Sequence, residues 1–379
     1  MRVFFNSRHD AHDGAGEMHH GRMVPCFENA RRIPIIRDAV AHAIKAQLFD
    51  PKDHGMDPIR AIHDPDYLDF LETAWDGWTK AGNSGDAFPY VWPTAGFSGG
   101  KPEHISARLG QYAISSDTPI TQGTWKAAYW GAQTVISAAE AAWSDNESSF
   151  ALTRPPGHHA HANRYGGYCF LNNAAIAAQH MIAKGAKKVA ILDIDYHHGN
   201  GAQDIFYERG DVLTISIHAN PTHQFPFFMG YANETGRNDG QGANLNVPLP
   251  GGSDFGAWGT GFAKAMQKLL TWQADALVVA LGVDAHEAEP ICDFKLQTDD
   301  FNRIGQMIGR LGLKTVFTME GGYAHDVSAN TGFPDRAYRP HVRGAGNRAG
   351  RVQGVRRADI RRLPSSISTK CHAHQGTSG

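Results

Sequence analysis

The sequence predicts an α/β protein in which a central, mostly parallel β-sheet is flanked by helices. Short apolar runs alternate along the chain with amphipathic stretches of helical length, and strands that are joined by helices pair in parallel. The run 189–192 is apolar without interruption, as in strands that are buried on both faces. With 379 residues, 41% of them hydrophobic, the chain can form one large core of this kind.

Three elements are predicted before residue 77. A strand is expected at 1–5. An amphipathic helix is expected at 28–48 and is interrupted near Pro34, because proline lacks the N–H group that a helix interior uses. A short helix at 65–75 follows, with Asp64, a favoured N-cap residue, just before it.

The stretch 77–110 is predicted to be a long loop. Glycine, proline, serine and aromatic residues replace the helical pattern here, and Tyr90, Trp92 and Phe97 are among them. A loop of this length inside a compact domain usually binds something, and exposed aromatic side chains favour a protein or ligand surface. We therefore expect 77–110 to be an interaction segment.

Helices and strands alternate over the rest of the domain. The patterns predict helices at 124–143, 172–184, 255–272 and 299–311, and strands at 150–153, 189–192, 212–217, 276–281 and 315–319. An irregular loop is expected from 218 to 252. Ligands of open parallel sheets bind beyond the carboxyl ends of the strands, so polar residues that follow these strands are the first candidates for a functional site.

The chain beyond Tyr323 loses this pattern. Arginine, glycine and serine take over, with nine arginines between Arg336 and Arg362. Such a segment buries too little apolar surface to offset its ordering entropy. We therefore divide the chain into a domain at 1–323 and a poorly ordered tail at 324–379.

Charge, hydropathy and cysteine content argue against several classes of protein. The first 330 residues hold 26 Lys and Arg against 36 Asp and Glu, which disfavours nucleic acid and favours cationic substrates. No apolar run is long enough for a membrane span and no signal peptide is recognisable, so a cytoplasmic protein is expected. Cys26, Cys169, Cys292 and Cys371 are scattered, which argues against a disulfide framework and a thiolate zinc site.

Two strand ends carry the residues of a possible metal site. In VAILDIDYHHGN, 189–200, Asp195 and His197 lie two apart, so their side chains point the same way on an extended chain. LGVDAHEAEP, 281–290, repeats the design with Asp284. These two carboxylates and one imidazole leave a position for water, as catalytic zinc requires. Ferrous iron tolerates such ligands too, so the identity of the metal stays open.

Two further clusters supply groups for acid–base chemistry. RPPGHHA, 154–160, presents His158 and His159 after a rigid turn, and MEGGY, 319–323, ends another strand with Tyr323. A metal-bound water needs a base, which either histidine can be, and an oxyanion needs a donor such as the tyrosine. Each cluster alone can be a solvated strand end, but their common place at one sheet edge favours a hydrolytic site.

In this order, the motifs RPPGHHA, GGYCFLNN, DIDYHHGNG, GVDAHEAEP and EGGY resemble those of the histone deacetylase and acetylpolyamine amidohydrolase superfamily. The resemblance spans about 1–323 and implies the arginase/deacetylase-like three-layer fold. It also implies a zinc-dependent deacetylase that releases acetate from an N-acetylated amine by means of a metal-activated water. Asp195, His197 and Asp284 would be the metal ligands.

The resemblance also distributes roles around the metal. His158 and His159 would form the acid/base pair, with His159 as the general base, and Tyr323 would polarise the amide carbonyl. Asp193 would orient His158. Asn200 stands beside His159 where some relatives have aspartate, which should make His159 less basic. A structural potassium ion is implied as well, at Asp193, Asp195, His197, Ser216 and Ile217.

The resemblance further implies a substrate tunnel. Tyr168 and Phe225 match its aromatic walls, with Gly167 beside them, which suits a thin alkyl chain that carries an acetamide. Glu17 matches an acidic residue at the tunnel mouth, and Asp117 is a second candidate there. Carboxylates at a narrow mouth would attract a distal ammonium group.

The segment 17–28 and the 77–110 insertion look most like the bacterial acetylpolyamine amidohydrolases, in which the insertion builds a homodimer that narrows the tunnel. We therefore expect acetylated polyamines as substrates, of the acetylputrescine, acetylcadaverine and acetylspermidine type. A protein acetyl-lysine deacetylase with the same chemistry is the first alternative. A non-catalytic protein that binds acetylated cations is the second, and an arginase-like ureohydrolase is less favoured because two manganese ions need more carboxylates.

Overall fold

The computed structural model describes residues 1–44, 46–97, 99–145 and 147–324. The chain divides into two units, 1–339 and 340–379, and every described residue belongs to the first. The expectation of a poorly ordered tail at 324–379 therefore falls, apart from Ala324, outside the described residues.

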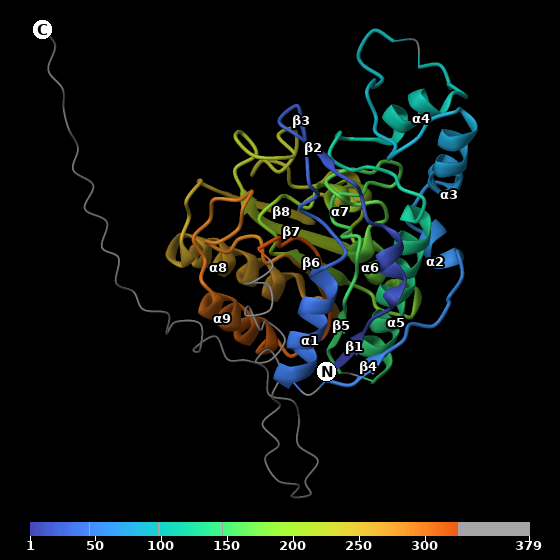
Figure 1. The fold of residues 1–379 in the computed structure, drawn as a ribbon. Helices are drawn as coiled ribbons and strands as arrows, with labels where there is room; N and C mark the ends of the chain where they lie inside the picture. Colours follow the sequence, from blue (N-terminus) through green and yellow to red (C-terminus); the bar gives the residue numbers. More distant parts are fainter. Residues whose placement is uncertain (45, 98, 146, 325–379) are drawn as a thin grey trace, which may run out of the picture. The chain divides into compact units, whose positions relative to one another are not determined.

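An eight-stranded sheet forms the centre of this unit (Figure 1). Its strands follow the order β4-β1-β5-β10-β9-β6-β7-β8, and their pairings are all parallel. In chain order they are β1 (Arg2–Phe4), β4 (Leu48–Phe49), β5 (Ser149–Ala151), β6 (Val189–Asp193), β7 (Val212–Ala219), β8 (Asn244–Leu249), β9 (Ala276–Leu281) and β10 (Lys314–Met319). The predicted parallel sheet is confirmed.

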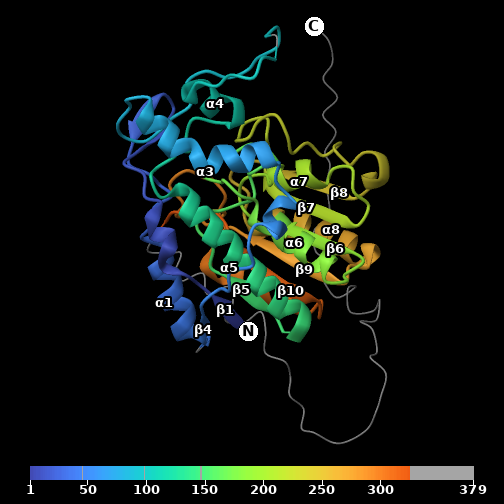
Figure 2. The same cartoon turned by 90° about the vertical axis from the view of Figure 1, so that its right-hand side faces the viewer.

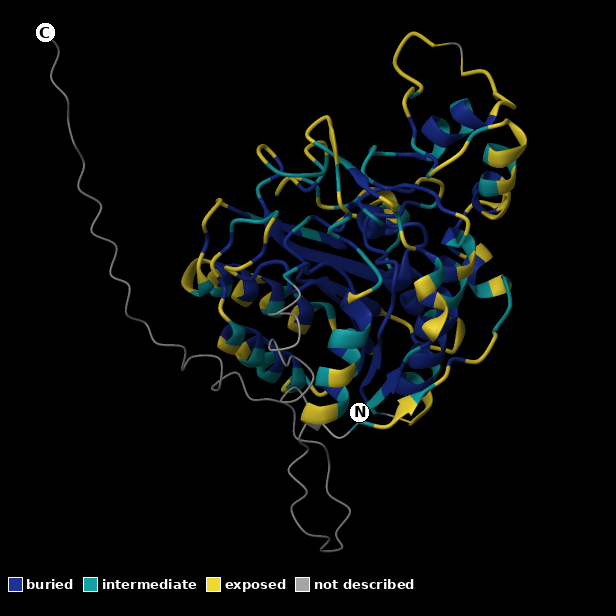
Figure 3. Cartoon of the chain, viewed as in Figure 1, coloured by how far each residue is buried: buried dark blue, intermediate teal, exposed yellow. Residues whose placement is uncertain are grey.

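Helices cover both faces of the sheet, which gives three layers (Figures 1 and 2). On one side lie α2 (Asp57–Arg60), α3 (Pro65–Lys80), α4 (Ile105–Tyr112), α5 (Thr124–Asp145), α6 (Asn173–Ala183) and α7 (Asn200–Phe206). On the other lie α1 (Arg32–Ile44), α8 (Phe255–Trp272) and α9 (Thr298–Gly309). Successive strand residues face opposite cores, so the central strands are buried throughout (Figure 3). No helix in the described ranges is both long and apolar enough to cross a membrane.

The predicted helix at 28–48 is wrong at both ends. α1 begins at Arg32 and ends at Ile44, and Pro34 lies in its first turn. Proline does not break a helix at this place, because the first N–H groups have no partner within the helix.

The predicted loop at 77–110 contains helical residues at both ends. α3 continues through Lys80, beyond its predicted end, and α4 begins at Ile105. Asp64 holds the predicted N-cap position of α3, but its carboxylate accepts from the side chain of Asn163 (3.0 Å) rather than from the helix.

Strand β8 falls in the stretch 218–252, where the sequence predicts an irregular loop. Asn244, Asn246 and Pro248 interrupt its apolar pattern. An edge strand tolerates proline, because an N–H group on its outer side has no ladder partner. The two-stranded hairpin of β2 (Glu17–His19) and β3 (Arg22–Val24) is also absent from the prediction.

A buried ion cluster ties distant segments together. The Glu28 carboxylate accepts from Arg32 (3.1 Å) and Arg154 (2.9 Å), and the three side chains are at most 2% exposed. Arg32 also donates to the carbonyls of Glu320 (2.6 Å) and Gly322 (2.7 Å) after β10. Arg154 donates to two carbonyls of the N-terminal segment. Burial opposes ionisation of Glu28, but the two guanidinium groups hold its pKa below the usual value.

Replacing Glu28 with glutamine should destabilise the protein strongly. Both guanidinium groups would stay buried without their shared anion, and breaking such a pair costs about 3–5 kcal/mol. Asp57→Asn is the matched control, because the Asp57–Arg60 pair (3.6 Å) is exposed and such pairs contribute at most about 1 kcal/mol. Urea unfolding measures both variants. Equal stabilities would show that the cluster does not hold the fold.

Candidate active site

The sequence clusters meet at the carboxyl ends of four neighbouring strands. β5, β10, β9 and β6 are adjacent in the sheet, and RPPGHHA, EGGY, GVDAHEAEP and DIDYHHGNG follow them in that order. The strand ends lie nearly level, since Met319 pairs with Leu281 and Asp193 with Ala280. Parallel strands reach the same edge each time, so residues far apart in sequence share one site.

The structure brings Asp195, His197 and Asp284 together. Nδ1 of His197 lies 3.0 Å from Asp284 Oδ2 and 3.4 Å from Asp195 Oδ1. Backbone N–H groups orient both carboxylates: Gly321 donates to Asp195 Oδ2, and Tyr196 donates to Asp284 Oδ1, each at 2.8 Å. The three donor groups therefore converge.

This donor set fits a divalent cation. Two carboxylates with at most 1% exposure face one imidazole, and uncompensated buried charge is costly. Burial, together with the neighbouring Asp195, raises the pKa of Asp284 to about 6. Nδ1 of His197, which lies within 3.4 Å of both carboxylates, is the ring nitrogen that would bind a metal ion. Gly321 keeps this space narrow, since a Cβ there would lie 2.6 Å from Asp195 Oδ2 and 2.7 Å from Asp284 Oδ2.

His158 is held by carboxylates. Its Nδ1 lies 2.9 Å from Asp193 Oδ2, and its Nε2 lies 3.8 Å from Asp195 Oδ1. Burial lowers the pKa of this imidazole, but Asp195 and Asp193 outweigh burial and raise the pKa to about 10. Asp193 is oriented in turn by the N–H of Asp195 (3.0 Å). The surroundings of His158 therefore favour its charged form.

His159 has surroundings of the opposite character. Its ring centroid lies 3.9 Å from that of His158, and its Nδ1 lies 2.6 Å from Asn200 Oδ1. Burial lowers the pKa of His159 well below its ordinary value, and the charges of His158 and His197 lower it further. A neutral imidazole that donates from Nδ1 keeps a lone pair on Nε2. The two histidines are thus suited to different roles.

The loop after β10 fixes Tyr323 from several sides. The N–H of Tyr323 donates to Glu289 (2.7 Å), and the carbonyl of Gly322 accepts from Arg32 (2.7 Å). The guanidinium of Arg32 lies 4.9 Å from the Tyr323 ring centroid, and the Tyr168 ring meets it edge-on at 5.5 Å. Burial raises the pKa of Tyr323 well above its ordinary value, so the phenol keeps its proton and can donate a hydrogen bond to an oxyanion.

The predicted tunnel walls also lie at this centre. The Phe225 ring meets the His159 ring edge-on at 4.9 Å, while Tyr168 contacts Tyr323. Gly167 packs so closely that a Cβ there would lie 2.3 Å from His159 Cδ2 and 3.1 Å from Phe225. Its φ of 54° also favours glycine. A side chain at position 167 would therefore displace the histidine.

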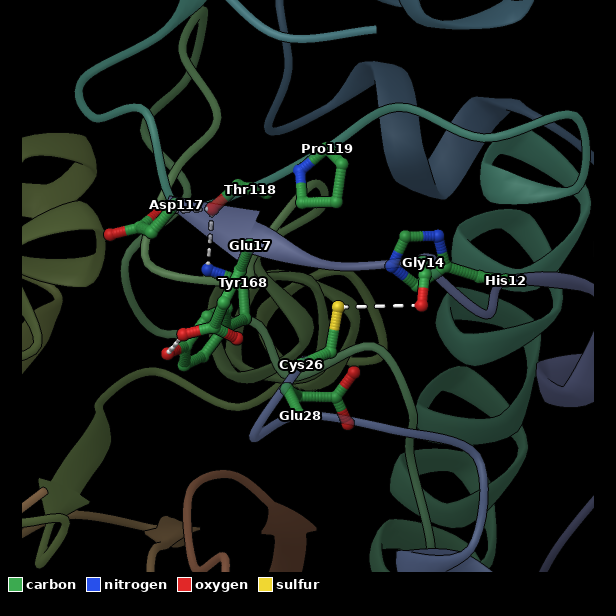
Figure 4. A pocket seen from close by; sticks show the side chains of 9 residues that line it. All are labelled: His12, Gly14, Glu17, Cys26, Glu28, Asp117, Thr118, Pro119 and Tyr168. Atoms are coloured by element: carbon green, nitrogen blue, oxygen red, sulfur yellow. Dashed lines mark hydrogen bonds between the residues drawn. The ribbon is translucent and has the colours of Figure 1, made fainter. Parts of the chain in front are cut away.

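Glu17 is not an open carboxylate at a tunnel mouth, which corrects the expectation. It is 1% exposed and accepts from the hydroxyl of Tyr168 (2.7 Å) and the N–H of Phe27 (2.9 Å). The β2–β3 hairpin turns it inward, beside a cavity of about 10 Å³ (Figure 4), which has room for about one water. Burial raises the pKa of Glu17 to about 7. Glu17 therefore holds the hydroxyl of Tyr168, which is one of the residues predicted to form the tunnel wall.

Asp117 braces the glycine turn next to Tyr168. Its Oδ1 accepts from the hydroxyls of Ser115 (2.7 Å) and Thr118 (2.5 Å) and from the N–H of Gly167 (3.1 Å). One of its carboxylate oxygens points away from the small cavity (Figure 4). Asp117 thus helps to position two of the predicted tunnel residues.

The residues predicted for a potassium ion lie at the end of β6, just after it, and on β7. Ser216 is the register partner of Asp193, and Ile217 follows it on β7. The Ser216 hydroxyl lies 2.8 Å from His218 Nδ1 and accepts from the N–H of Gly199 (3.4 Å).

Several residues around the site escape sequence reasoning. Glu320 accepts from the N–H of His158 (3.0 Å), and the Cys292 sulfur lies within 4.8 Å of donor atoms of His197 and Asp284. Arg32, Glu289 and Arg154 hold the loops, as described above. Glu289 and Arg154 lie inside motifs that the sequence analysis identifies. Their location near the site could therefore be predicted from the sequence, whereas their hydrogen-bond partners could not.

Comparison with known proteins agrees with this geometry. The family model of the histone deacetylase domain matches residues 26–332. The chain is 45% identical to acetylpolyamine amidohydrolase 2 of Pseudomonas aeruginosa over 86% of this chain and 94% of that protein. It is 43% identical to the acetylpolyamine amidohydrolase of Mycoplana ramosa over 85% and 95%.

The fold has solved counterparts as well. The crystal structure of an acetylpolyamine aminohydrolase from Burkholderia pseudomallei superposes with a TM-score of 0.84 at 37% identity, over 88% of this chain and 97% of that one. The HDA15 HD domain superposes with a TM-score of 0.73 at 27% identity. The predicted resemblance and the predicted arginase/deacetylase-like fold are both confirmed: the chain belongs to the histone deacetylase domain family.

Proposed function

We propose that the protein is a metal-dependent deacetylase that hydrolyses acetylated polyamines to acetate and the free amine. The observation that carries the proposal is the meeting of three metal-ligand groups with two histidines of opposite character and a protonated phenol. A protein that only binds acetylated cations has no need of such a pair. The names of the similar bacterial proteins support the polyamine as substrate.

Asp195, His197 and Asp284 would hold the catalytic metal, which is zinc or ferrous iron by the chemistry of the donors. When bound, the ion lowers the pKa of a water molecule and polarises the amide carbonyl.

A potassium ion would bind at Asp193, Asp195, His197, Ser216 and Ile217. Thermal unfolding in potassium and in tetramethylammonium at equal ionic strength tests this second site, and equal midpoints would refute it.

The other residues of the site move or orient protons. His159 accepts a proton from the attacking water at Nε2 and returns it to the leaving amine nitrogen as the amide C–N bond breaks. His158, oriented by Asp193 and favoured as a cation, stabilises negative charge in the transition state. The Tyr323 hydroxyl donates a hydrogen bond to the acetyl oxygen. One water is consumed, and acetate and an amine are released.

Tyr168 and Phe225 would hold the alkyl chain next to the acetamide. Their rings contact Tyr323 and His159, respectively, so a chain between them places its carbonyl beside both groups. Flat aromatic walls suit a thin methylene chain and exclude water from the reacting carbon. This arrangement supports a linear acetylated amine as the substrate.

We also propose a homodimer built by the 77–110 insertion. Tyr90, Val91 and Phe97 in this segment are 72%, 42% and 64% exposed, and exposed apolar side chains that cluster in one segment mark interfaces. A second copy seated there would narrow the entrance against protein substrates.

The setting we propose is cytoplasmic, without nucleic acid or membrane partners. The three described cysteines are free, as in a reducing compartment, and the acidic balance of the first 330 residues repels nucleic acid. Gel-shift and vesicle-flotation assays should show no binding, and binding in either would refute this part of the proposal.

The function is tested by comparing kcat/KM for acetylputrescine and for an acetyl-lysine peptide with the zinc-loaded protein. We expect acetylputrescine to be preferred. His159→Ala should lower kcat at least about 100-fold, because general-base catalysis is lost, while the metal content stays the same. His223→Ala, which changes an exposed histidine, is the control. Preference for the peptide would favour a protein deacetylase, and absence of turnover with metal bound would favour a binding protein.

The role of Glu17 is tested with the pair Glu17→Gln and Tyr168→Phe. Tyr168→Phe removes the donor of the hydrogen bond (2.7 Å), and Glu17→Gln leaves one accepting oxygen for the two donors, Tyr168 and Phe27, so both should raise KM by a similar factor, about 2–10-fold. The increase in KM should be equal for acetylputrescine and for neutral N-butylacetamide. An increase in KM that is seen only with acetylputrescine and only in Glu17→Gln would show that Glu17 binds the distal ammonium directly.

The dimer is tested by analytical ultracentrifugation. Replacing Tyr90 and Phe97 with serine should convert dimer to monomer, because both apolar anchors are removed. Leu270→Ser is the control, since Leu270 is a 45% exposed apolar residue on α8. A wild-type monomer, or a dimer that survives the double substitution, would contradict the proposed interface.

A further inference from the structure

A chain of hydrogen bonds leads from His159 to the protein surface. His159 Nδ1 lies 2.6 Å from Asn200 Oδ1, Asn200 Nδ2 lies 2.8 Å from His161 Nε2, and His161 Nδ1 lies 2.9 Å from Asp204 Oδ2. Asn200 and His161 are buried, with 2% and 6% exposure, whereas the Asp204 side chain is 49% exposed. The chain thus begins at the proposed base and ends at a carboxylate in contact with water.

The backbone places these side chains in line. Asn200 and Asp204 are four residues apart in α7, so they lie on one face of the helix, and His161 contacts both. The turn that carries His159 and His161 is held against α7, because the N–H of Gly201 donates to the carbonyl of His158 (3.0 Å).

When His161 is neutral, one arrangement of protons satisfies every contact in this chain. The Asp204 carboxylate can only accept, so His161 donates from Nδ1 and keeps a lone pair on Nε2. That lone pair accepts from the amide nitrogen of Asn200, which turns the amide oxygen toward His159. His159 must then donate from Nδ1, and its Nε2 carries the lone pair that a general base needs.

An amide at position 200 needs this support, whereas a carboxylate would not. A carboxylate offers the neighbouring imidazole an acceptor in either orientation. A flipped amide would present its N–H group to His159 and would favour the wrong tautomer. Because Asn200 is buried, water cannot correct a mismatch, and its partner His161 decides the orientation.

We propose that His161 and Asp204 are positioning residues that lock the amide of Asn200 and, through it, the tautomer of His159. The inference rests on the proposed deacetylase function, in which His159 is the base. Both residues act through Asn200 and need no contact with the substrate. The lock presents Nε2 of His159 as an acceptor before each turnover.

Kinetics of substituted proteins test the lock. His161→Met removes the acceptor at similar side-chain length, so kcat should fall about tenfold, as for the loss of one buried hydrogen bond, with KM within about twofold. His161→Gln restores an accepting oxygen and should recover most of kcat. Asp204→Ala should lower kcat as well, because the tautomer of His161 is no longer fixed.

Glu208→Ala is the matched control for Asp204→Ala. The Glu208 side chain is also 49% exposed and also paired, in this case with Arg237, but it has no hydrogen bond to His161 or Asn200. Its removal should leave kcat unchanged. A loss equal to that of Asp204→Ala would show that any nearby carboxylate matters and would overturn the lock.

A second measurement does not depend on turnover. The ¹⁵N chemical shifts of histidine-labelled protein distinguish the two tautomers of a neutral imidazole. His159, assigned from the spectrum of His159→Ala, should be protonated at Nδ1 alone in the wild type and should show both tautomers in His161→Met. An unchanged His159 tautomer in that variant would refute the lock.

The Asn200→Asp background separates positioning from a purely structural role. A carboxylate needs no orientation, so His161→Met should lose its effect on kcat in this background, whereas an equal loss in both backgrounds would overturn the proposal. If the wild type hydrolyses no acetylated amine, the proposed function fails, and the tautomer measurement still decides on the lock. If the wild type is active and His161→Met keeps full kcat, the lock alone fails.

Discussion

The burial of one anion between two guanidinium groups is the constraint on which the rest of this site depends. Glu28 cannot leave Arg32 and Arg154 without stranding two buried cations. Through them the N-terminal segment, the turn before His158 and the loop that bears Tyr323 are fixed to one another. The position of the phenol donor is therefore set by residues that take no part in the proposed chemistry.

Within that frame, neighbouring groups give two adjacent histidines different properties. His158 faces the carboxylates of Asp193 and Asp195, which favour its charged form. His159 faces an amide and a glycine, and burial favours its neutral form. A neutral imidazole that acts as a base and a charged imidazole can thus lie side by side, because their neighbouring groups differ. The same logic applies to Asp195 and Asp284, whose carboxylates converge on His197 where the proposed cation would compensate their charge.

The sheet and the strand-end clusters could be predicted because buried parallel strands leave continuous apolar runs, and the charged residues follow them directly, as at Asp195 and Asp284. What depends on distant partners could not. Glu17 has the sequence features of an exposed charge, and its burial follows from Tyr168, 151 residues away. Pro34 has the features of a helix breaker, and only its place in the first turn makes it harmless. Local sequence patterns do not specify contacts of this kind.

The bond from Arg32 to the carbonyl of Gly322 joins residues 290 positions apart, which has a consequence for biosynthesis. The ribosome delivers the arginine long before its acceptor. Until β10 emerges, the growing sheet also lacks the strand between β5 and β9. A nascent chain therefore carries the proposed metal ligands without Tyr323 and without a finished sheet to hold them. The strand that completes the centre of the sheet, between β5 and β9, is thus the last of its strands to be synthesised.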